Sequence, residues 1–436
     1  MFAERRRRFM EKMEGGVAVI FAAPERTRSN DTNHRFRQDS DFQYLTGFPE
    51  PDAAAVILPG SEEHDFILFV RDRNKERETW DGRRFGPEGA KEHFEADAAY
   101  PIEHLDELLP VYLEDATGLY YSLGRYPDRD ALVMAAMADV KKKVRLGIGA
   151  PHGILDPSAI LNEMRLFKSP DEVELMRRAA VISCEAHREA MRTLRPGVHE
   201  YEIEAVIEYV FRRRGAVAPA YATIAGGGRN AAILHYTENT DVCRDGDLLL
   251  VDAGCEYQGY AADITRTFPV NGTFSPLQRD VYQVVLDAQV KAVDAVRLGR
   301  TFDDVHQTAL RRLVEGLVDL KILGGSVDKI IEDESYKPYY MHRTGHWLGL
   351  DVHDVGDYRK GKDWRALEAG MVLTVEPGLY FAEDDTSVTE EFRGLGIRIE
   401  DDVLVTAGDP DVLTREAPKT VEEVEAVMAE AAEAVL

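Results

Sequence analysis

The stretch from residue 247 to residue 268 constrains the fold more than any other part of the sequence. Residues 248–251 are all apolar, and residues 264–268 are rich in β-branched and aromatic side chains, so each segment predicts a strand. Tyr257 and Gln258, followed by a glycine, predict a tight turn between the two strands. The stretch is therefore expected to form an antiparallel hairpin.

Two aspartates are expected to meet across this hairpin. Folded about the predicted turn, Asp252 and Asp263 stand directly opposite each other, with Cβ atoms roughly 4.5–5.5 Å apart. Like charges in that position destabilise a sheet unless positive charge lies between them, and a pair of divalent metal ions about 3.5–4 Å apart would fit. The alternative is a solvated acidic hairpin, although Asp252 ends an apolar run that predicts burial.

Length and charge limit what the chain can be. Its 436 residues exceed the usual size of one hydrophobic core, which predicts two domains. A capping box from Ser169 to Glu172 begins a helix, so we expect the boundary between residues 1–165 and residues 166–436. The net charge of −26 argues against nucleic acid or an anionic membrane as a partner. No apolar leader or membrane-length apolar run is present, so a cytoplasmic location is expected.

The first domain alternates strand and helix patterns, which predicts an α/β domain. We expect strands at residues 17–21, 53–58 and 65–70, and helices at residues 101–115 and 128–143. Trp80 lies in a polar, glycine-rich segment that predicts a loop, where an exposed tryptophan would indicate binding. In the second domain, helices are expected at residues 170–193, 199–214, 276–297 and 301–320.

Glycines accompany the histidines of the second domain. Residues 226–228 are three glycines without the Gly-Lys-Ser/Thr of a phosphate loop, so we expect them to bring His235 to the end of a short strand. His342, His346 and His353 lie close together in the sequence. The spacing of the first two would suit a zinc-binding helix, but the intervening glycines favour a turn.

A second pair of strands, at residues 371–376 and 394–405, carries more charged side chains. The period of two places Arg398 and Glu400 on one face of their strand. Glu376 is expected to end its strand, because the Pro-Gly pair after it turns the chain away. Together with the first hairpin and the histidine segment, these strands give five candidate metal ligands, namely Asp252, Asp263, His346, Glu376 and Glu400. Four carboxylates and an imidazole suit Mn²⁺, and also Co²⁺ or Zn²⁺.

These residues fall in motifs that resemble the pita-bread dinuclear metallopeptidases, and among them aminopeptidase P, the Xaa-Pro aminopeptidase family. The motifs are His235-Tyr-Thr-Glu-Asn, Asp252-Ala-Gly with Asp263-Ile-Thr-Arg, His346-Trp-Leu-Gly-Leu-Asp-Val-His353-Asp, Glu376-Pro-Gly and Gly396-Ile-Arg398-Ile-Glu400. The resemblance covers nearly the whole chain, since residues 37–48 are similar to that family's N-terminal domain. It implies an α+β fold, with a pita-bread catalytic domain behind a creatinase-like α/β N-terminal domain.

The resemblance also implies roles for the site residues. Asp252 would bind one metal ion, His346 and Glu376 the other, and Asp263 and Glu400 would bridge them. His235, His342, His353 and Arg398 match the site residues of the family, as substrate or catalytic contacts. Trp80 matches a loop that reaches the site of a neighbouring subunit, which implies a homodimer or homotetramer. Arg343 departs from the pattern, because relatives often carry glycine there.

The implied activity is release of the N-terminal residue from peptides whose second residue is proline. A hydroxide held between the metal ions would attack, Glu376 would take its proton, and His353 and His235 would hold the substrate and the developing oxyanion. A specialised pocket is needed because proline has no amide hydrogen. The alternatives are an Xaa-Pro dipeptidase (prolidase) with the same ligands, and a non-catalytic peptide- or protein-binding module.

Overall fold

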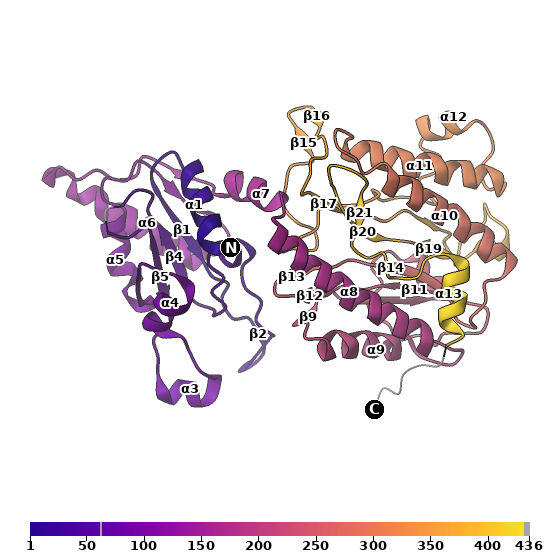
Figure 1. The fold of residues 1–436 in the computed structure, drawn as a ribbon, viewed down its shortest axis with the longest axis horizontal. Coiled ribbons are helices and arrows are strands. Elements are labelled where there is room, and N and C mark those ends of the chain that lie inside the picture. The colour runs from indigo at the N-terminus through magenta and orange to yellow at the C-terminus, as the bar shows by residue number, and fades with distance from the viewer. Residues whose placement is uncertain (62, 431–436) are drawn as a thin grey trace. The chain divides into compact units, whose positions relative to one another are not determined.

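The protein divides into two compact units, Met1–Arg165 and Leu166–Leu436, in a computed structural model that describes residues 1–61 and 63–430 (Figure 1). Both units combine helices and sheets. Among the described residues, no helix is long and apolar enough to cross a membrane.

A six-stranded mixed sheet forms the centre of the first unit, with the strand order β6-β5-β4-β1-β7-β8. Strand β4 runs antiparallel to both β1 and β5, and the other neighbours are parallel. The strands are β1 (Val17–Phe21), β4 (Ala54–Ile57), β5 (Phe66–Val70), β6 (Ala98–Pro101), β7 (Leu119–Tyr120) and β8 (Ile154–Leu155), and a separate hairpin joins β2 (Thr27–Ser29) to β3 (Thr32–Asn33). The three strands predicted in this unit are therefore confirmed.

Helices complete the first unit. They are α1 (Phe2–Lys12), α2 (Ser40–Thr46), α3 (Lys75–Asp81), α4 (Gly86–Phe94), α5 (Leu105–Tyr112), α6 (Pro127–Lys141) and α7 (Ser158–Leu166). Apolar side chains of α5 and α6 pack on alternate residues of β1 and β4 in one core, exemplified by Leu109, Val133, Val19 and Val56. The helix predicted from residue 101 begins later, at Leu105, because residues 98–101 pair with β5 and a short 3₁₀ turn follows.

In the second unit, two helix pairs lie on opposite sides of the strands, α8 with α9 and α10 with α11 (Figure 1). The helices are α8 (Pro170–Thr193), α9 (Glu200–Arg213), α10 (Pro276–Asp294), α11 (Phe302–Asp319), α12 (Val327–Glu332) and α13 (Val421–Met428). Helix α8 begins at the capping box that the sequence predicts. The four long helices predicted for this unit are confirmed, to within a few residues at their ends.

Short antiparallel strands of the second unit lie between these helix pairs. They are β9 (Ala218–Pro219), β10 (Ile224–Gly227), β11 (Leu248–Asp252), β12 (Cys255–Tyr257), β13 (Tyr260–Ala261), β14 (Thr265–Pro269), β15 (Arg359–Lys360), β16 (Asp363–Trp364), β17 (Val372–Val375), β18 (Gly378–Tyr380), β19 (Gly396–Arg398), β20 (Asp401–Leu404) and β21 (Asp411–Val412). The β14 and β19 backbones are joined through Thr267, whose hydroxyl donates to the carbonyl of Arg398 and accepts from its amide. The two predicted hairpins therefore lie side by side.

Candidate metal centre

The first predicted hairpin is present, but its register differs from the prediction. Asp252 pairs with Thr265 instead of Asp263, a shift of two residues. The reason is the position of the turn: Gln258 and Gly259 both have positive φ, 50° and 89°, so they are its two central residues. This is the conformation of a two-residue type I′ turn, one position later than the sequence suggested.

Asp252 and Asp263 nevertheless converge on one hydroxyl. The Tyr221 hydroxyl lies 2.6 Å from Oδ1 of Asp252 and 2.5 Å from Oδ1 of Asp263. Asp263 lies two residues before the start of β14, where the chain passes close to Gly254. A Cβ atom on Gly254 would fall 1.7 Å from the carbonyl oxygen of Ala262, so only glycine permits this approach.

The second hairpin aligns two glutamates. Strand β17 pairs with β20, and beyond a short interruption β18 pairs with β19. The register Val375↔Asp401 before the gap and Gly378↔Arg398 after it leaves Glu376 facing Glu400. Strand β17 ends at Val375, so the predicted end of the strand at Glu376 agrees with the structure, but Pro377 does not turn the chain away, because β18 continues the hairpin after it.

The histidine segment is not helical, which agrees with its glycines, but residues 344–347 run extended beside β17 instead of forming the expected turn. The amide of Thr374 donates to the carbonyl of His346, and the amide of Glu376 donates to the carbonyl of Thr344. Gly345 permits this contact, since a Cβ there would lie 2.0 Å from the Thr374 carbonyl oxygen. Nδ1 of His346 donates to the Trp347 carbonyl, 2.9 Å away, which leaves Nε2 as the nitrogen that can bind a metal ion.

Three candidate ligands form a compact cluster. One ligand atom from each of Asp263, His346 and Glu400 lies within 4.8 Å of the others. Nε2 of His346 lies 3.3 Å from Asp263 Oδ2 and 3.7 Å from Glu376 Oε1. Asp252 adjoins the cluster through Tyr221, so the five predicted ligands gather at one place.

The carboxylates are held by neutral donors and one arginine. The Thr265 hydroxyl donates to Oε2 of Glu400 at 2.6 Å, and the Thr374 hydroxyl donates to Oε1 of Glu376 at 3.3 Å. Nη2 of Arg398 donates to Oδ2 of Asp252 at 2.6 Å. One arginine and one histidine cannot neutralise four carboxylates, so the negative charge here is only partly balanced.

The pKa values reflect this imbalance. Burial raises the pKa of Glu376 to about 7. Burial and the charge of Asp263 raise the pKa of Glu400 well above its usual range, and burial raises that of Asp263. Although burial opposes it, hydrogen bonding to Asp263 and the charge of Glu376 raise the pKa of His346 to about 9. Divalent cations would stabilise the ionised form of these buried carboxylates and offset their mutual repulsion, so the donor set fits metal ions.

A cavity of 480 Å³ opens onto the cluster. All five candidate ligands line it, together with His235, His342, His353 and Arg398. The His353 ring centroid lies 4.3 Å from that of His346. His235 lies on a turn after the 3₁₀ helix at residues 228–232, so its predicted place at the end of a strand is wrong.

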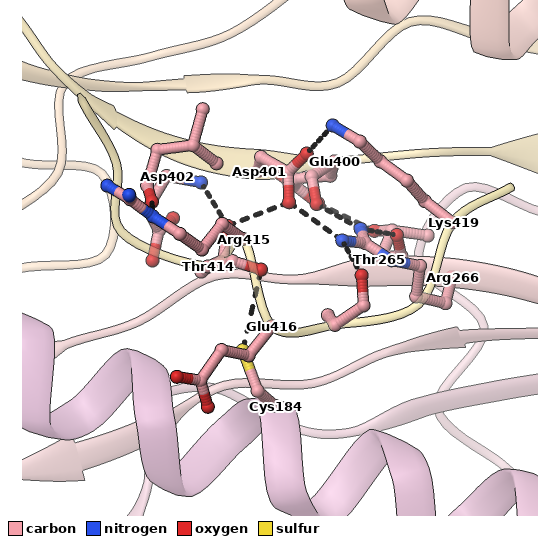
Figure 2. A network of polar contacts seen from close by, with 12 residues as sticks. Cys184, Thr265, Arg266, Glu400, Asp401, Asp402, Thr414, Arg415, Glu416 and Lys419 are labelled. Atoms are coloured by element: carbon pink, nitrogen blue, oxygen red, sulfur yellow. Dashed lines mark hydrogen bonds and ion pairs between the residues drawn. The ribbon is translucent and has the colours of Figure 1, made fainter. Parts of the chain in front are cut away.

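A second layer of charge lies behind Glu400 (Figure 2). Arg266, which is fully buried, donates through Nη2 to Oδ1 of Asp401 at 2.7 Å and through Nη1 to the Glu400 carbonyl at 2.5 Å. Asp401 also accepts from Lys419 at 2.7 Å and from the Thr414 hydroxyl at 2.8 Å. This network fixes the backbone that carries Glu400.

Sequence reasoning missed three residues that organise the site. Tyr221 joins the two aspartates, and Thr265 holds Glu400. The Tyr380 hydroxyl lies 2.9 Å from Nε2 of His342 and accepts from Arg398 Nη1 at 3.0 Å, so it links two cavity residues. Of the three, only Thr265 could have been found from the sequence. It lies two residues after Asp263 on a predicted strand, so the period of two places both side chains on the same face.

Trp80 belongs to the first unit and lies on a short helix, not in a loop. Helix α3 has no buried residue and stands away from the sheet of its unit (Figure 1). The Trp80 side chain is 83% exposed, although a tryptophan usually buries a large apolar area. The ring is therefore available for contact with another molecule.

Comparisons with known proteins match both units to known families. Residues 174–407 match the model of metallopeptidase family M24, and residues 2–120 match the aminopeptidase P, N-terminal domain. The chain is 46% identical to the Xaa-Pro aminopeptidase of Escherichia coli (strain K12), over 98% of this chain and 97% of that protein. It is 34% identical to the human Xaa-Pro dipeptidase, over 98% of this chain and 93% of the other.

Solved structures agree with these matches. The structure of aminopeptidase PepP from Pseudomonas aeruginosa superposes with a TM-score of 0.97 at 50% sequence identity, covering 98% of this chain and 97% of that chain. The predicted α+β fold class is therefore confirmed. By the family models and by identity along nearly its whole length, the chain belongs to metallopeptidase family M24 and, within it, to the aminopeptidase P proteins.

Proposed function

We propose that this protein is a metal-dependent Xaa-Pro aminopeptidase, which releases the N-terminal residue from peptides with proline in the second position. The observation that carries the proposal is the cluster of Asp263, His346 and Glu400 at a 480 Å³ cavity, in a chain 46% identical to an Xaa-Pro aminopeptidase. The cavity is large enough to hold a few residues of a peptide.

The residues at the cluster suit two divalent metal ions. We assign Asp252 to one ion, His346 and Glu376 to the other, and Asp263 and Glu400 to both. Carboxylates outnumber the single imidazole, so the set favours Mn²⁺, with Co²⁺ or Zn²⁺ as substitutes. The contact between His346 Nδ1 and the Trp347 carbonyl supports this assignment, because it directs Nε2 towards the carboxylates.

The protein's own residues bind the substrate, accept a proton and stabilise developing charge. When bound, the metal ions would polarise the scissile carbonyl and lower the pKa of water. Glu376 accepts the proton of the attacking water, which its place beside the cluster allows. His235 and His353 hold the substrate and stabilise the negative charge that develops on the carbonyl oxygen. Arg398 and His342 share the Tyr380 hydroxyl, so both are oriented in the cavity wall.

The quaternary arrangement and location follow from other features. We propose a homodimer or homotetramer in which Trp80 contributes to the site of a neighbouring subunit, because its ring is 83% exposed on a projecting helix.

Cys184, Cys243 and Cys255 are all buried and free. Free cysteines are typical of a reducing compartment, which supports a cytoplasmic location.

Peptide length separates this proposal from its alternatives. The test compares cleavage of Ala-Pro, Ala-Pro-Ala and Ala-Ala-Ala by the purified protein with Mn²⁺ added. We expect hydrolysis of the tripeptide that contains proline, and little of the other two. Cleavage of Ala-Pro alone would favour an Xaa-Pro dipeptidase. No cleavage of any peptide by protein that binds metal would favour a non-catalytic binding module.

A further inference from the structure

The wall of the cavity carries one accessible arginine. Among the described residues that line it, four are carboxylates and two are arginines, Arg398 and Arg343. Arg398 is only 3% exposed and is paired with Asp252, so a substrate reaches it poorly. The Arg343 side chain is 43% exposed, which leaves it open to a ligand.

Arg343 is also held in place, unlike most exposed arginines. Its Nη2 donates to Oδ1 of Asp303 at 2.6 Å. Its guanidinium carbon lies 4.8 Å from the ring centroid of Trp364, on strand β16. A salt bridge and a cation–π contact together restrict the side chain, so less rotamer entropy is lost when it binds an anion.

The backbone of Arg343 lies next to the metal centre, through contacts with His342. The Arg343 carbonyl lies 2.7 Å from Nδ1 of His342, and the same nitrogen lies 3.7 Å from Oε2 of Glu376. A peptide whose scissile carbonyl lies at the cluster extends further along the cavity, by roughly 3.3–3.6 Å for each residue. The residue after proline is thus roughly 7 Å away, within reach of a long side chain in the adjacent wall.

We propose that Arg343 binds a substrate carboxylate located beyond the proline and thereby favours peptides that carry one there. This specificity rests on the proposed Xaa-Pro aminopeptidase activity. Without Arg343, the cavity would offer such a carboxylate no exposed arginine, because Arg398 is buried and paired with Asp252. The planar guanidinium suits a carboxylate, because it can donate two parallel hydrogen bonds.

The carboxylate could be the C-terminus of a tripeptide or an acidic side chain, and three substrates distinguish these sources. They are Ala-Pro-Ala with a free C-terminus, Ala-Pro-Ala amide, and Ala-Pro-Glu amide. For the wild-type protein we expect a KM for at least one acidic substrate about five- to tenfold below that of the neutral amide, with similar kcat. Raising the salt concentration should reduce the difference, because the contact is partly exposed.

Variants test whether Arg343 causes this preference. Arg343→Gln should remove it by raising the KM of the acidic substrate, and Arg343→Lys should restore part of it through the charge. Arg359→Gln is the matched control, since Arg359 also stacks on Trp364, at 4.0 Å, but does not line the cavity. Metal content and melting temperature of each variant report on folding.

The outcomes are distinct. Loss of the preference in Arg343→Gln but not in Arg359→Gln supports the proposal, and the substrate affected identifies the source of the carboxylate. An unchanged ratio of KM values in Arg343→Gln, or no preference in the wild-type protein, overturns it. Cleavage of the neutral amide by the wild-type protein tests the aminopeptidase activity separately, so the two proposals can fail independently.

Discussion

Replacing Asp401 with asparagine should destabilise the catalytic unit strongly. The carboxylate is fully buried, and it accepts from Arg266 at 2.7 Å and from Lys419 at 2.7 Å (Figure 2). Asparagine keeps the volume but removes the charge, so the buried Arg266 loses its counterion. Removing one partner of a buried ion pair costs about 3–5 kcal/mol. For a unit of this size, that loss corresponds to a melting temperature lower by roughly 10 °C.

A surface pair provides the control for this measurement. Glu383 and Arg229 approach to 3.3 Å, with side chains 63% and 58% exposed. Glu383→Gln should therefore cost less than about 1 kcal/mol. The free energy of unfolding of both variants is measured by denaturant titration of the metal-loaded protein. A loss in Asp401→Asn no larger than that in Glu383→Gln would refute the reasoning that the network depends on its charge.

Three further predictions concern the site. His346→Ala should lose bound metal, whereas His353→Ala should keep the metal and lose turnover; elemental analysis showing equal metal loss would contradict this division of roles. Mn²⁺ binding should release protons near pH 7 and strengthen as the pH rises, because the metal-free protein holds protons on Glu376, with a pKa of about 7, and on His346, with a pKa of about 9. Calorimetry in buffers of different ionisation enthalpy measures the release, and a value of zero would be inconsistent. Trp80→Ala should slow peptide cleavage yet change the free energy of unfolding by no more than about 0.5 kcal/mol, since the ring is 83% exposed; unchanged cleavage would exclude a role for the ring.

The sequence was most informative where local patterns determine structure. The capping box at Ser169 and the apolar period predicted α8 at the bounds that the structure has. Continuous apolar runs predicted β1, β4 and β5. Motifs and alternation also indicated which acidic and histidine side chains converge at the cavity.

The register of the first hairpin could not be predicted, because it depends on which residues adopt positive φ. The prediction placed Tyr257 and Gln258 at the centre of the turn, whereas Gln258 and Gly259 are the residues with positive φ, one position later. Asp252 consequently pairs with Thr265 across the two strands. Asp252 and Asp263 are linked by the Tyr221 hydroxyl, which contacts both carboxylates. A tyrosine in an irregular segment has no periodic signal, so only the three-dimensional contacts revealed its role.

The most direct test of the central claim is whether hydrolysis of Ala-Pro-Ala depends on the metal ions that the cluster is proposed to hold. Activity is measured before chelation, after removal of metal with verification by elemental analysis, and after addition of Mn²⁺. We expect chelation to abolish release of the N-terminal alanine and Mn²⁺ to restore it, with Glu400→Gln inactive throughout. Full activity in the verified metal-free protein would contradict the account.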